Sequence, residues 1–142
     1  MLSFFASKFV KEEKPKTLGQ LGEEWAQEEY RKKGYKIIGA NVYNTKGKQA
    51  GEIDFIAVNK TSIVFVEVKT RKLITGKFGS GVEAVNVYKQ RKMLLAVKMF
   101  LQRKAQYQTL RPQIDVCSVV ARDVDKKDYS VTILVNSVED WN

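Results

Sequence analysis

The chain has 142 residues, of which 44% are hydrophobic and 29% charged, and its formal net charge is +9. This length and composition predict one globular domain, and the charge favours a polyanionic partner, nucleic acid first and an acidic membrane surface second. The absence of histidine and the single cysteine, Cys117, exclude an intrachain disulfide, a cysteine metal cluster and imidazole catalysis.

Residues 1–16 are predicted to be an N-terminal extension, and residues 17–142 a single domain. The charged stretch 11–16 contains Pro15 and reads as a linker. The sequence shows no secretion signal and no apolar run long enough for a membrane span, so we expect a cytoplasmic protein that does not bind a membrane. Cys117 lies in an apolar run and is interpreted as a small core residue.

Hydrophobic periodicity and turn residues predict an α/β fold with the order α-β-β-β-α-β-β. The first helix has a T-x-x-Q capping box at Thr17 and Gln20, and Gly34 is its stop signal. The second helix has two candidate caps, Ser80 and Asn86. The expected elements are a helix at 17–33, strands at 35–43, 52–58 and 63–70, a helix at 83–105, and strands at 114–121 and 129–135.

The two middle strands predict a hairpin whose loop is the polar stretch 59–62. An even loop pairs Val58 with Ile63 and therefore places Asp54 directly opposite Glu67. Because side chains alternate along a strand, Asp54, Glu67 and Lys69 then share one face. Opposed side chains lie about 5 Å apart at their Cβ atoms, so these two carboxylates are expected to meet.

Two carboxylates at that distance repel each other, and their apolar neighbours penalise ionisation further. Either one of them holds a proton, or a divalent cation such as Mg²⁺ or Mn²⁺ lies between them. Lys69 would stand beside the water shell of such a metal. Glu23 is a further candidate ligand, because Gly22 beside it would let the first helix approach the sheet closely.

Structural roles for the same residues remain open at this point. Glu67 and Lys69 also fit the solvent-facing end of an amphipathic strand, with Lys69 paired to Glu52. Asp54 also fits a turn residue at a strand start, and Glu23 a solvated helix residue.

Taken in order, the motifs resemble a known family. The sequence G-E-I-D at 51–54, followed by E-V-K at 67–69, resembles the core motif of the PD-(D/E)xK nuclease superfamily. The supporting stretches are G-Q-L-G-E-E-W-A at 19–26, N-V-Y at 41–43, G-E-I-D-F-I-A at 51–57, F-V-E-V-K-T-R at 65–71, E-A-V…K at 83–89 and I-D-V at 114–116. Over about 17–121 the chain resembles the YraN-like family of predicted bacterial endonucleases, which is similar in outline to archaeal Holliday-junction resolvases. Ile53 stands where the superfamily has proline.

The resemblance implies a restriction-endonuclease-like mixed β-sheet of about five strands flanked by helices. It also implies a metal-dependent endonuclease with Mg²⁺ or Mn²⁺ held by Asp54, Glu67 and Glu23, and with Lys69 as the fourth catalytic residue. Lys69 would orient or deprotonate the attacking water, or stabilise the transition state. A backbone carbonyl near Val68 is a further candidate ligand.

Basic residues on both sides of the expected site are interpreted as phosphate contacts, which read the backbone and not the sequence. They are Arg71, Lys72, Lys77, Lys89, Arg91 and Lys92. For Lys89, a solvated lysine in a basic cluster is an equally open interpretation. We therefore expect cleavage of structured or branched DNA with little sequence specificity, by a monomer or a homodimer. The alternatives are a non-catalytic nucleic-acid-binding protein of the same fold and an interaction protein that docks on an acidic partner.

Overall fold

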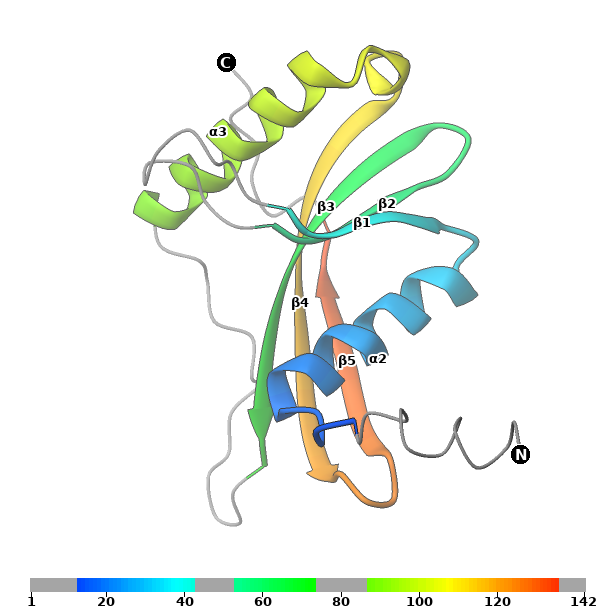
Figure 1. Cartoon of the computed structure of the whole chain (residues 1–142), viewed down its shortest axis with the longest axis vertical. Helices are drawn as coiled ribbons and strands as arrows, with labels where there is room; N and C mark the ends of the chain where they lie inside the picture. The colour runs from blue at the N-terminus through cyan, green and yellow to red at the C-terminus, as the bar shows by residue number, and fades with distance from the viewer. Residues whose placement is uncertain (1–12, 43–52, 74–86, 136–142) are drawn as a thin grey trace, which may run out of the picture.

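Two helices lie against opposite faces of a five-stranded sheet in the computed structural model, which describes residues 13–42, 53–73 and 87–135 (Figure 1). The chain order α-β-β-β-α-β-β expected from the sequence is confirmed. The elements are α2 (Leu18–Lys32), β1 (Lys36–Val42), β2 (Ile53–Val58), β3 (Ser62–Lys72), α3 (Val87–Arg103), the short 3₁₀ helix η1 (Ala105–Tyr107), β4 (Arg111–Asp123) and β5 (Asp128–Leu134).

The strands lie side by side in chain order, β1-β2-β3-β4-β5. Only β3 and β4 are parallel, and every other neighbouring pair is antiparallel. A parallel pair requires a crossover connection, and α3 lies in the segment that joins β3 to β4. The expected mixed sheet is therefore confirmed.

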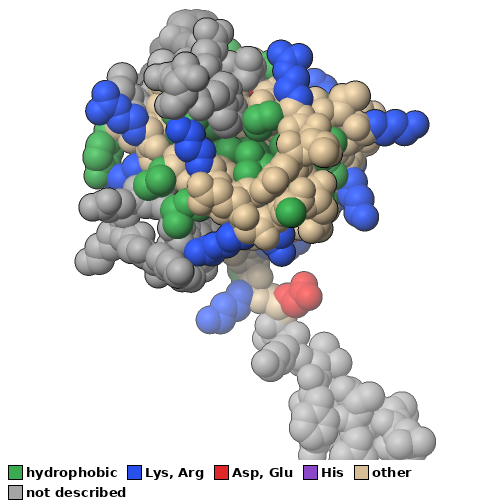
Figure 2. All heavy atoms as spheres, turned by 90° about the horizontal axis from the view of Figure 1, so that it is seen from above, with side chains coloured by type: hydrophobic (Ala, Val, Ile, Leu, Met, Phe, Trp, Pro, Cys, Tyr) green, Lys and Arg blue, Asp and Glu red, His purple; other side chains and the backbone are tan. Residues whose placement is uncertain are grey.

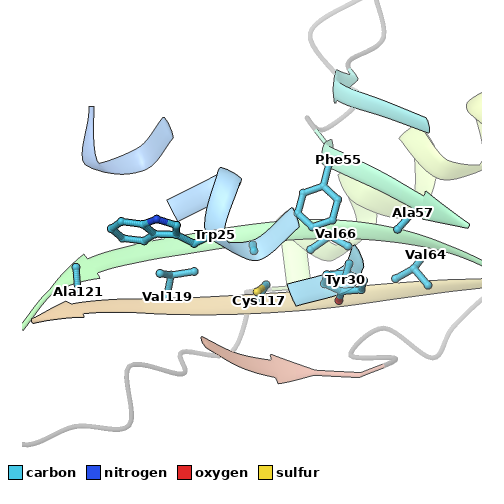
Figure 3. Packing of buried hydrophobic residues seen from close by; sticks show 10 residues of the cluster. Trp25, Tyr30, Phe55, Ala57, Val64, Val66, Cys117, Val119 and Ala121 are labelled. Atoms are coloured by element: carbon cyan, nitrogen blue, oxygen red, sulfur yellow. The ribbon is translucent and has the colours of Figure 1, made fainter. Parts of the chain in front are cut away.

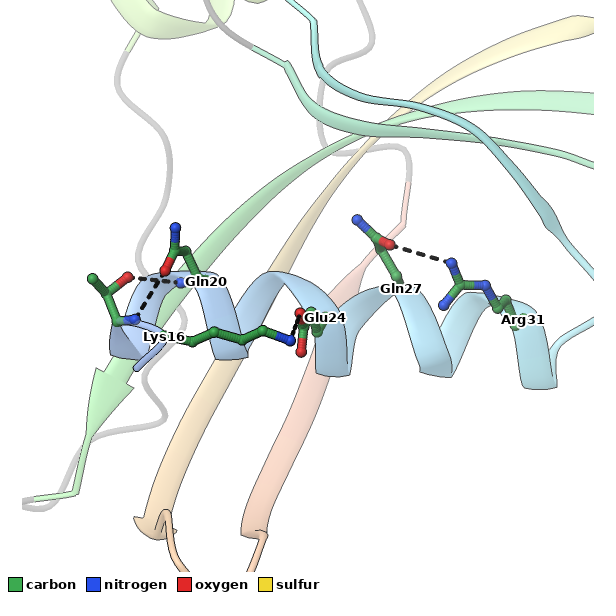
Figure 4. A network of polar contacts seen from close by, with 6 residues as sticks. Lys16, Gln20, Glu24, Gln27 and Arg31 are labelled. Carbon is green, nitrogen blue, oxygen red and sulfur yellow. Dashed lines mark hydrogen bonds and ion pairs between the residues drawn. The ribbon is translucent and has the colours of Figure 1, made fainter. Parts of the chain in front are cut away.

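Both predicted signals at the ends of α2 are present. The Gln20 N–H donates to Thr17 Oγ1 at 3.2 Å, and the Thr17 N–H donates to Gln20 Oε1 at 3.0 Å, which completes the capping box (Figure 4). Gly34, just past the helix, has a φ of 92°, a conformation that glycine adopts without steric cost.

The outer side of α2 carries local polar contacts. Lys16 Nζ lies 2.5 Å from Glu24 Oε1, and Arg31 donates to Gln27 at 3.4 Å (Figure 4). The Glu24 carboxylate raises the pKa of Lys16 through a hydrogen bond and its charge. These exposed contacts contribute little to stability, so α2 is held mainly by its inner face.

Gly22 on that inner face is where α2 meets β3. A Cβ atom at this position would lie 1.9 Å from Oγ1 of Thr70 and 2.6 Å from its Cγ2, far inside van der Waals contact. The expectation that glycine lets the helix approach the sheet is confirmed, and steric exclusion of any Cβ explains a glycine inside a helix.

A separate hydrophobic core fills each side of the sheet. The core under α2 is shown in Figure 3 and contains Trp25, Ala26, Tyr30, Phe55, Ala57, Val64, Val66, Cys117, Val119 and Ala121. The core under α3 contains Ile53, Ile56, Ile63, Phe65, Met93, Ala96, Val97, Ile114 and Val116. Alternate residues of β3 enter the two cores, which explains why this strand is apolar on both faces.

Cys117 is fully buried in the core under α2, as predicted, and burial raises the pKa of its thiol to about 12. The Trp25 ring in the same core stacks on Tyr129 with 4.3 Å between ring centroids, which ties α2 to β5. In the segments that the structure describes, no helix is long and apolar enough to cross a bilayer.

The strands β3 and β4 are longer than the sequence predicts. Parallel pairing joins them from Ser62–Arg111 to Lys72–Ala121, so each extends the other. Pro112 is tolerated because β5 pairs with β4 only from Val116 onward, which leaves that part of β4 with one neighbour. The helix expected at 83–105 ends at Arg103, and both candidate caps at its start lie outside the described residues.

Candidate active site

The β2–β3 hairpin has the register that the sequence predicts. Phe55 pairs with Val66, and Val58 pairs with Ile63. The turn between the strands is closed by Asn59, whose side-chain oxygen accepts the backbone N–H groups of the two residues after Lys60. The two residues that follow the Phe55–Val66 pair outward are therefore Asp54 and Glu67.

The two strands part at that point. The pairing of β2 with β3 ends at Phe55–Val66, whereas β3 stays paired with β4 as far as Lys72. The last residues of β3 therefore continue beyond β2 as part of the β3-β4-β5 half of the sheet (Figure 1).

The Asp54 side chain occupies the point of separation. Its Oδ2 accepts the hydrogen bond of the Val68 N–H at 2.6 Å, where an unbroken ladder would supply a backbone carbonyl. The Asp54 carboxylate therefore lies against the β3 backbone, one residue from Glu67. This short bond to a charged acceptor is of the strong kind, so it fixes the carboxylate in place.

Glu67 is a nearly buried carboxylate with a cationic partner. Only 7% of the residue is exposed, and the Lys89 Nζ of α3 forms an ion pair with its Oε1. Ile63 and Phe65, which precede Glu67 at alternate positions of β3, both belong to the core under α3. Glu67 is therefore placed on the α3 side of the sheet by strand alternation.

Lys69 follows two residues later on the same side of β3 and is partly exposed. Within the described segments, its side chain has no hydrogen-bond or ion-pair partner. Glu52, the alternative partner considered from the sequence, lies outside these segments.

The structure places Glu23 near β3 but does not group it with the other two carboxylates. Glu23 is half-buried and follows Gly22, whose helix turn contacts Thr70, three residues beyond Glu67. Among the residues that the structure describes, no three acidic or cysteine side chains gather closely enough to hold a metal ion. A role for Glu23 as a ligand stays a prediction.

The predicted phosphate contacts divide between two elements. Arg71 and Lys72 are exposed at the end of β3, and Arg91 and Lys92 lie on α3, while Lys77 falls outside the described residues. Helix α3 carries five basic residues, Lys89, Arg91, Lys92, Lys98 and Arg103, and no acidic one. Figure 2 shows the end of the molecule on which α3 lies, where Lys and Arg dominate the charged side chains.

Sequence reasoning missed a buried carboxylate on the other side of the sheet. Asp115 is 2% exposed and accepts hydrogen bonds from the Tyr30 hydroxyl at 2.6 Å and from Gln113 Nε2 at 2.8 Å. Burial, together with the Asp115 charge, raises the pKa of Tyr30 above its usual range. A charged residue inside the apolar run of β4 was the available signal. Its partners tie α2 to β4, away from Asp54 and Glu67.

Comparison with known proteins places these residues in a family. The model of the uncharacterised protein family UPF0102 matches residues 22–119, which contain Glu23, Asp54, Glu67, Lys69 and Lys89. A UPF0102 protein of Caldanaerobacter subterraneus subsp. tengcongensis is 38% identical over 110 residues, covering 78% of this chain and 84% of the relative. One of Clostridium botulinum is 33% identical over 124 residues, covering 87% and 95%. The chain belongs to the UPF0102 family, and the expected YraN-like relationship is confirmed.

Proposed function

We propose that this protein is a metal-dependent endonuclease that hydrolyses phosphodiester bonds in structured or branched DNA. One observation carries the proposal: the Asp54 carboxylate is fixed on the Val68 N–H, beside Glu67, where β2 leaves β3. Glu67 is nearly buried, and a buried carboxylate beside a second carboxylate is costly to keep for structure alone. Lys89 contacts Glu67, and Lys69 follows Glu67 on the same side of β3, so the position suits a negatively charged reactant.

The side chains at this position fit a divalent cation. The Lys89 ammonium group already lies on Oε1 of Glu67, so a positive charge is accommodated there. Carboxylate oxygens are the ligands that Mg²⁺ and Mn²⁺ prefer, and Asp54 and Glu67 would hold the ion, with Glu23 as a further ligand. When bound, such an ion supplies a water of lowered pKa and neutralises charge on the phosphate.

Side chains of the protein would position the reacting groups and stabilise the charge that develops on the phosphate. The Asp54–Val68 hydrogen bond keeps one carboxylate at a fixed position relative to β3, which lowers the cost of ordering the site. The Lys69 ammonium group orients the attacking water or stabilises charge that develops on the phosphate oxygens. If Asp54 and Glu67 held such an ion, the Lys89 ammonium group would be positioned to bind a phosphate instead of Glu67.

Basic residues around this centre would bind the DNA backbone. Arg71 and Lys72 continue from the site along β3, and Arg91 and Lys92 follow Lys89 on α3. Phosphate contacts of this type give affinity without reading sequence. The single buried cysteine and the DNA substrate together suit a cytoplasmic protein.

A non-catalytic nucleic-acid-binding protein is the second candidate. The Lys89–Glu67 ion pair favours it, because Lys89 neutralises Glu67 without any added cation. In that case the same basic residues would bind DNA, and the acidic pair would only position α3 against the sheet.

A cleavage assay separates the two candidates. Linear, single-stranded, flapped and four-way-junction DNA are incubated with the protein in Mg²⁺, Mn²⁺ or EDTA, beside Glu67→Gln and Lys69→Met. Lys60→Met is the matched control, since Lys60 is an exposed lysine in the turn at the other end of the hairpin. Metal-dependent cutting that is lost in the two site variants and kept in the control supports the nuclease. Binding of DNA without cutting of any substrate supports the second candidate.

A further inference from the structure

The outer face of α3 presents an aromatic ring among basic side chains. Tyr88 is 68% exposed, and Leu95, two turns later, is 40% exposed. Arg91 and Lys92 lie three and four residues after Tyr88, so they share its side of the helix. These four residues line a shallow depression of about 350 Å³. The buried side of the same helix is formed by Met93, Ala96 and Val97.

The ammonium group of Lys92 lies over the Tyr88 ring. Lys92 Nζ lies 4.5 Å from the centroid of the Tyr88 ring, at cation–π distance. Most of the Tyr88 side chain stays exposed despite this contact. The lining of the depression therefore combines an aromatic ring with cationic groups, the two components that bind a nucleotide.

The positive charge of α3 favours an anionic ligand on this face over a second copy of the chain. The helix has five basic residues and no acidic one, so its partner is expected to be anionic. A second copy docked symmetrically on this face would bring Arg91 and Lys92 against the same two residues, which costs like-charge repulsion. A polyanion with apolar rings is the complementary ligand.

We propose that Tyr88 is a stacking platform for an unpaired nucleobase and that Arg91 and Lys92 bind the neighbouring phosphates. The inference rests on the proposed nuclease function, because Tyr88 directly precedes Lys89, the residue that reaches Glu67. Consecutive helical residues point about 100° apart, so the base on Tyr88 would lie around α3 from the Lys89–Glu67 pair and not against it. The substrate class that follows is DNA with an unpaired nucleotide near the cleavage position.

Base stacking explains why this platform selects structure. Inside a duplex, the faces of each base are covered by its neighbours, and a side chain reaches them only after the base is unstacked. In a single strand, flap or junction branch, the faces of the bases are accessible. Because every base has a flat aromatic face, stacking tolerates any sequence. Tyr88 thus provides structure selection, while Arg91 and Lys92 bind both kinds of DNA.

Equilibrium binding without metal tests this role separately from cleavage. The full chain in EDTA is titrated into a fluorescently labelled short single strand and into the matching blunt duplex, and anisotropy gives the two values of Kd. We expect Tyr88→Ala to weaken single-strand binding about tenfold. We expect duplex binding to change by less than about twofold, because no stacking is lost there. Tyr88→Phe keeps the ring and should bind as the wild type does.

Arg91→Ala is the matched control for charge. It should weaken both DNAs together and reduce the salt dependence of both by about one unit of slope. The thermal midpoint of Tyr88→Ala is measured alongside, and little change is expected from an exposed position.

The following results overturn the inference. Equal loss for single strand and duplex in Tyr88→Ala, or no loss at all, leaves Tyr88 without a stacking role while the proposed DNA binding stands. A Tyr88→Phe variant as weak as Tyr88→Ala assigns the effect to the hydroxyl group. A wild-type dimer in sedimentation that Tyr88→Ala turns into a monomer makes this face an interface between copies. Failure of the wild type to bind either DNA would overturn the proposed function as well.

Discussion

Lys89, near the start of α3, forms an ion pair with Glu67, a nearly buried carboxylate of β3. The pair connects the helix to the sheet at the point where β2 and β3 separate. If Glu67 binds a divalent cation, as proposed, that cation would compete with the ammonium group for the same carboxylate. The strength of that competition is measurable without any assay of cleavage.

Replacing Lys89 with methionine removes the charge and keeps most of the apolar stem. We expect the free energy of unfolding of the metal-free protein to fall by about 1–2 kcal/mol, because Glu67 loses its cation. Mg²⁺ should then raise the Tm of the variant more than that of the wild type. Thermal unfolding with and without Mg²⁺ measures both effects, and Lys98→Met on the exposed side of the helix is the control. Equal Mg²⁺ shifts in variant and wild type would contradict the competition.

Asp54 accepts a hydrogen bond from the β3 backbone and is proposed to bind a metal ion, and two substitutions separate these roles. Asp54→Asn keeps a side-chain oxygen for the Val68 N–H, so we expect a Tm near the wild type but weaker binding of Mn²⁺. Asp54→Ala leaves this N–H without its acceptor and should also destabilise the fold by about 1–3 kcal/mol. Calorimetric titration with Mn²⁺ and thermal unfolding give the two readouts. Wild-type Mn²⁺ affinity in Asp54→Asn would remove this residue from the metal site.

The approach of α2 to β3 predicts opposite effects of two glycine substitutions. Gly22→Ala should destabilise the protein by about 1–3 kcal/mol, because the new Cβ overlaps the Thr70 side chain. At Gly19 the nearest atom to an added Cβ is Oγ1 of Thr17, at 3.9 Å, so Gly19→Ala should be neutral or gain up to about 1 kcal/mol of helix propensity.

Chemical denaturation of the two glycine variants measures the difference. Adding Thr70→Ala to Gly22→Ala should restore only part of the loss, because the remaining Cβ of residue 70 would still lie 2.8 Å away. Full recovery, or a stable Gly22→Ala single variant, would show that α2 moves away from the sheet at little cost.

Buried Cys117 predicts a loss of stability at alkaline pH. Burial raises the pKa of its thiol from 9.0 to about 12, so the folded state holds this proton more tightly than the unfolded state does. The stabilisation is fully present below pH 9 and is lost as the pH rises toward about 12. Unfolding by denaturant across this range should show the decline, and Cys117→Ala should flatten it. An unchanged slope in the variant would assign the decline to other groups, Tyr30 first, because its pKa is raised as well.

Local signals in the sequence predicted much of the fold. The Thr17–Gln20 capping box and Gly34 set the ends of α2, since capping depends on residues close in the chain. The hairpin register followed from a four-residue turn, because a turn of fixed length leaves only one pairing for the strands. From this register, the neighbourhood of Asp54 and Glu67 could be predicted. The lengths of β3 and β4 could not, because they depend on a partner strand far along the chain.

By itself, the sequence determined the element order, the family and the register of the β2–β3 hairpin, because periodicity and turns act over short stretches. Only the tertiary structure decided what each charge contacts. In the folded protein, Glu67 forms an ion pair with Lys89, and Asp54 accepts a hydrogen bond from the Val68 N–H. Asp115 is buried and accepts a hydrogen bond from Tyr30, whereas Tyr88 is exposed. Such contacts join residues 14 to 85 positions apart, and their geometry depends on how helices pack on a twisted sheet.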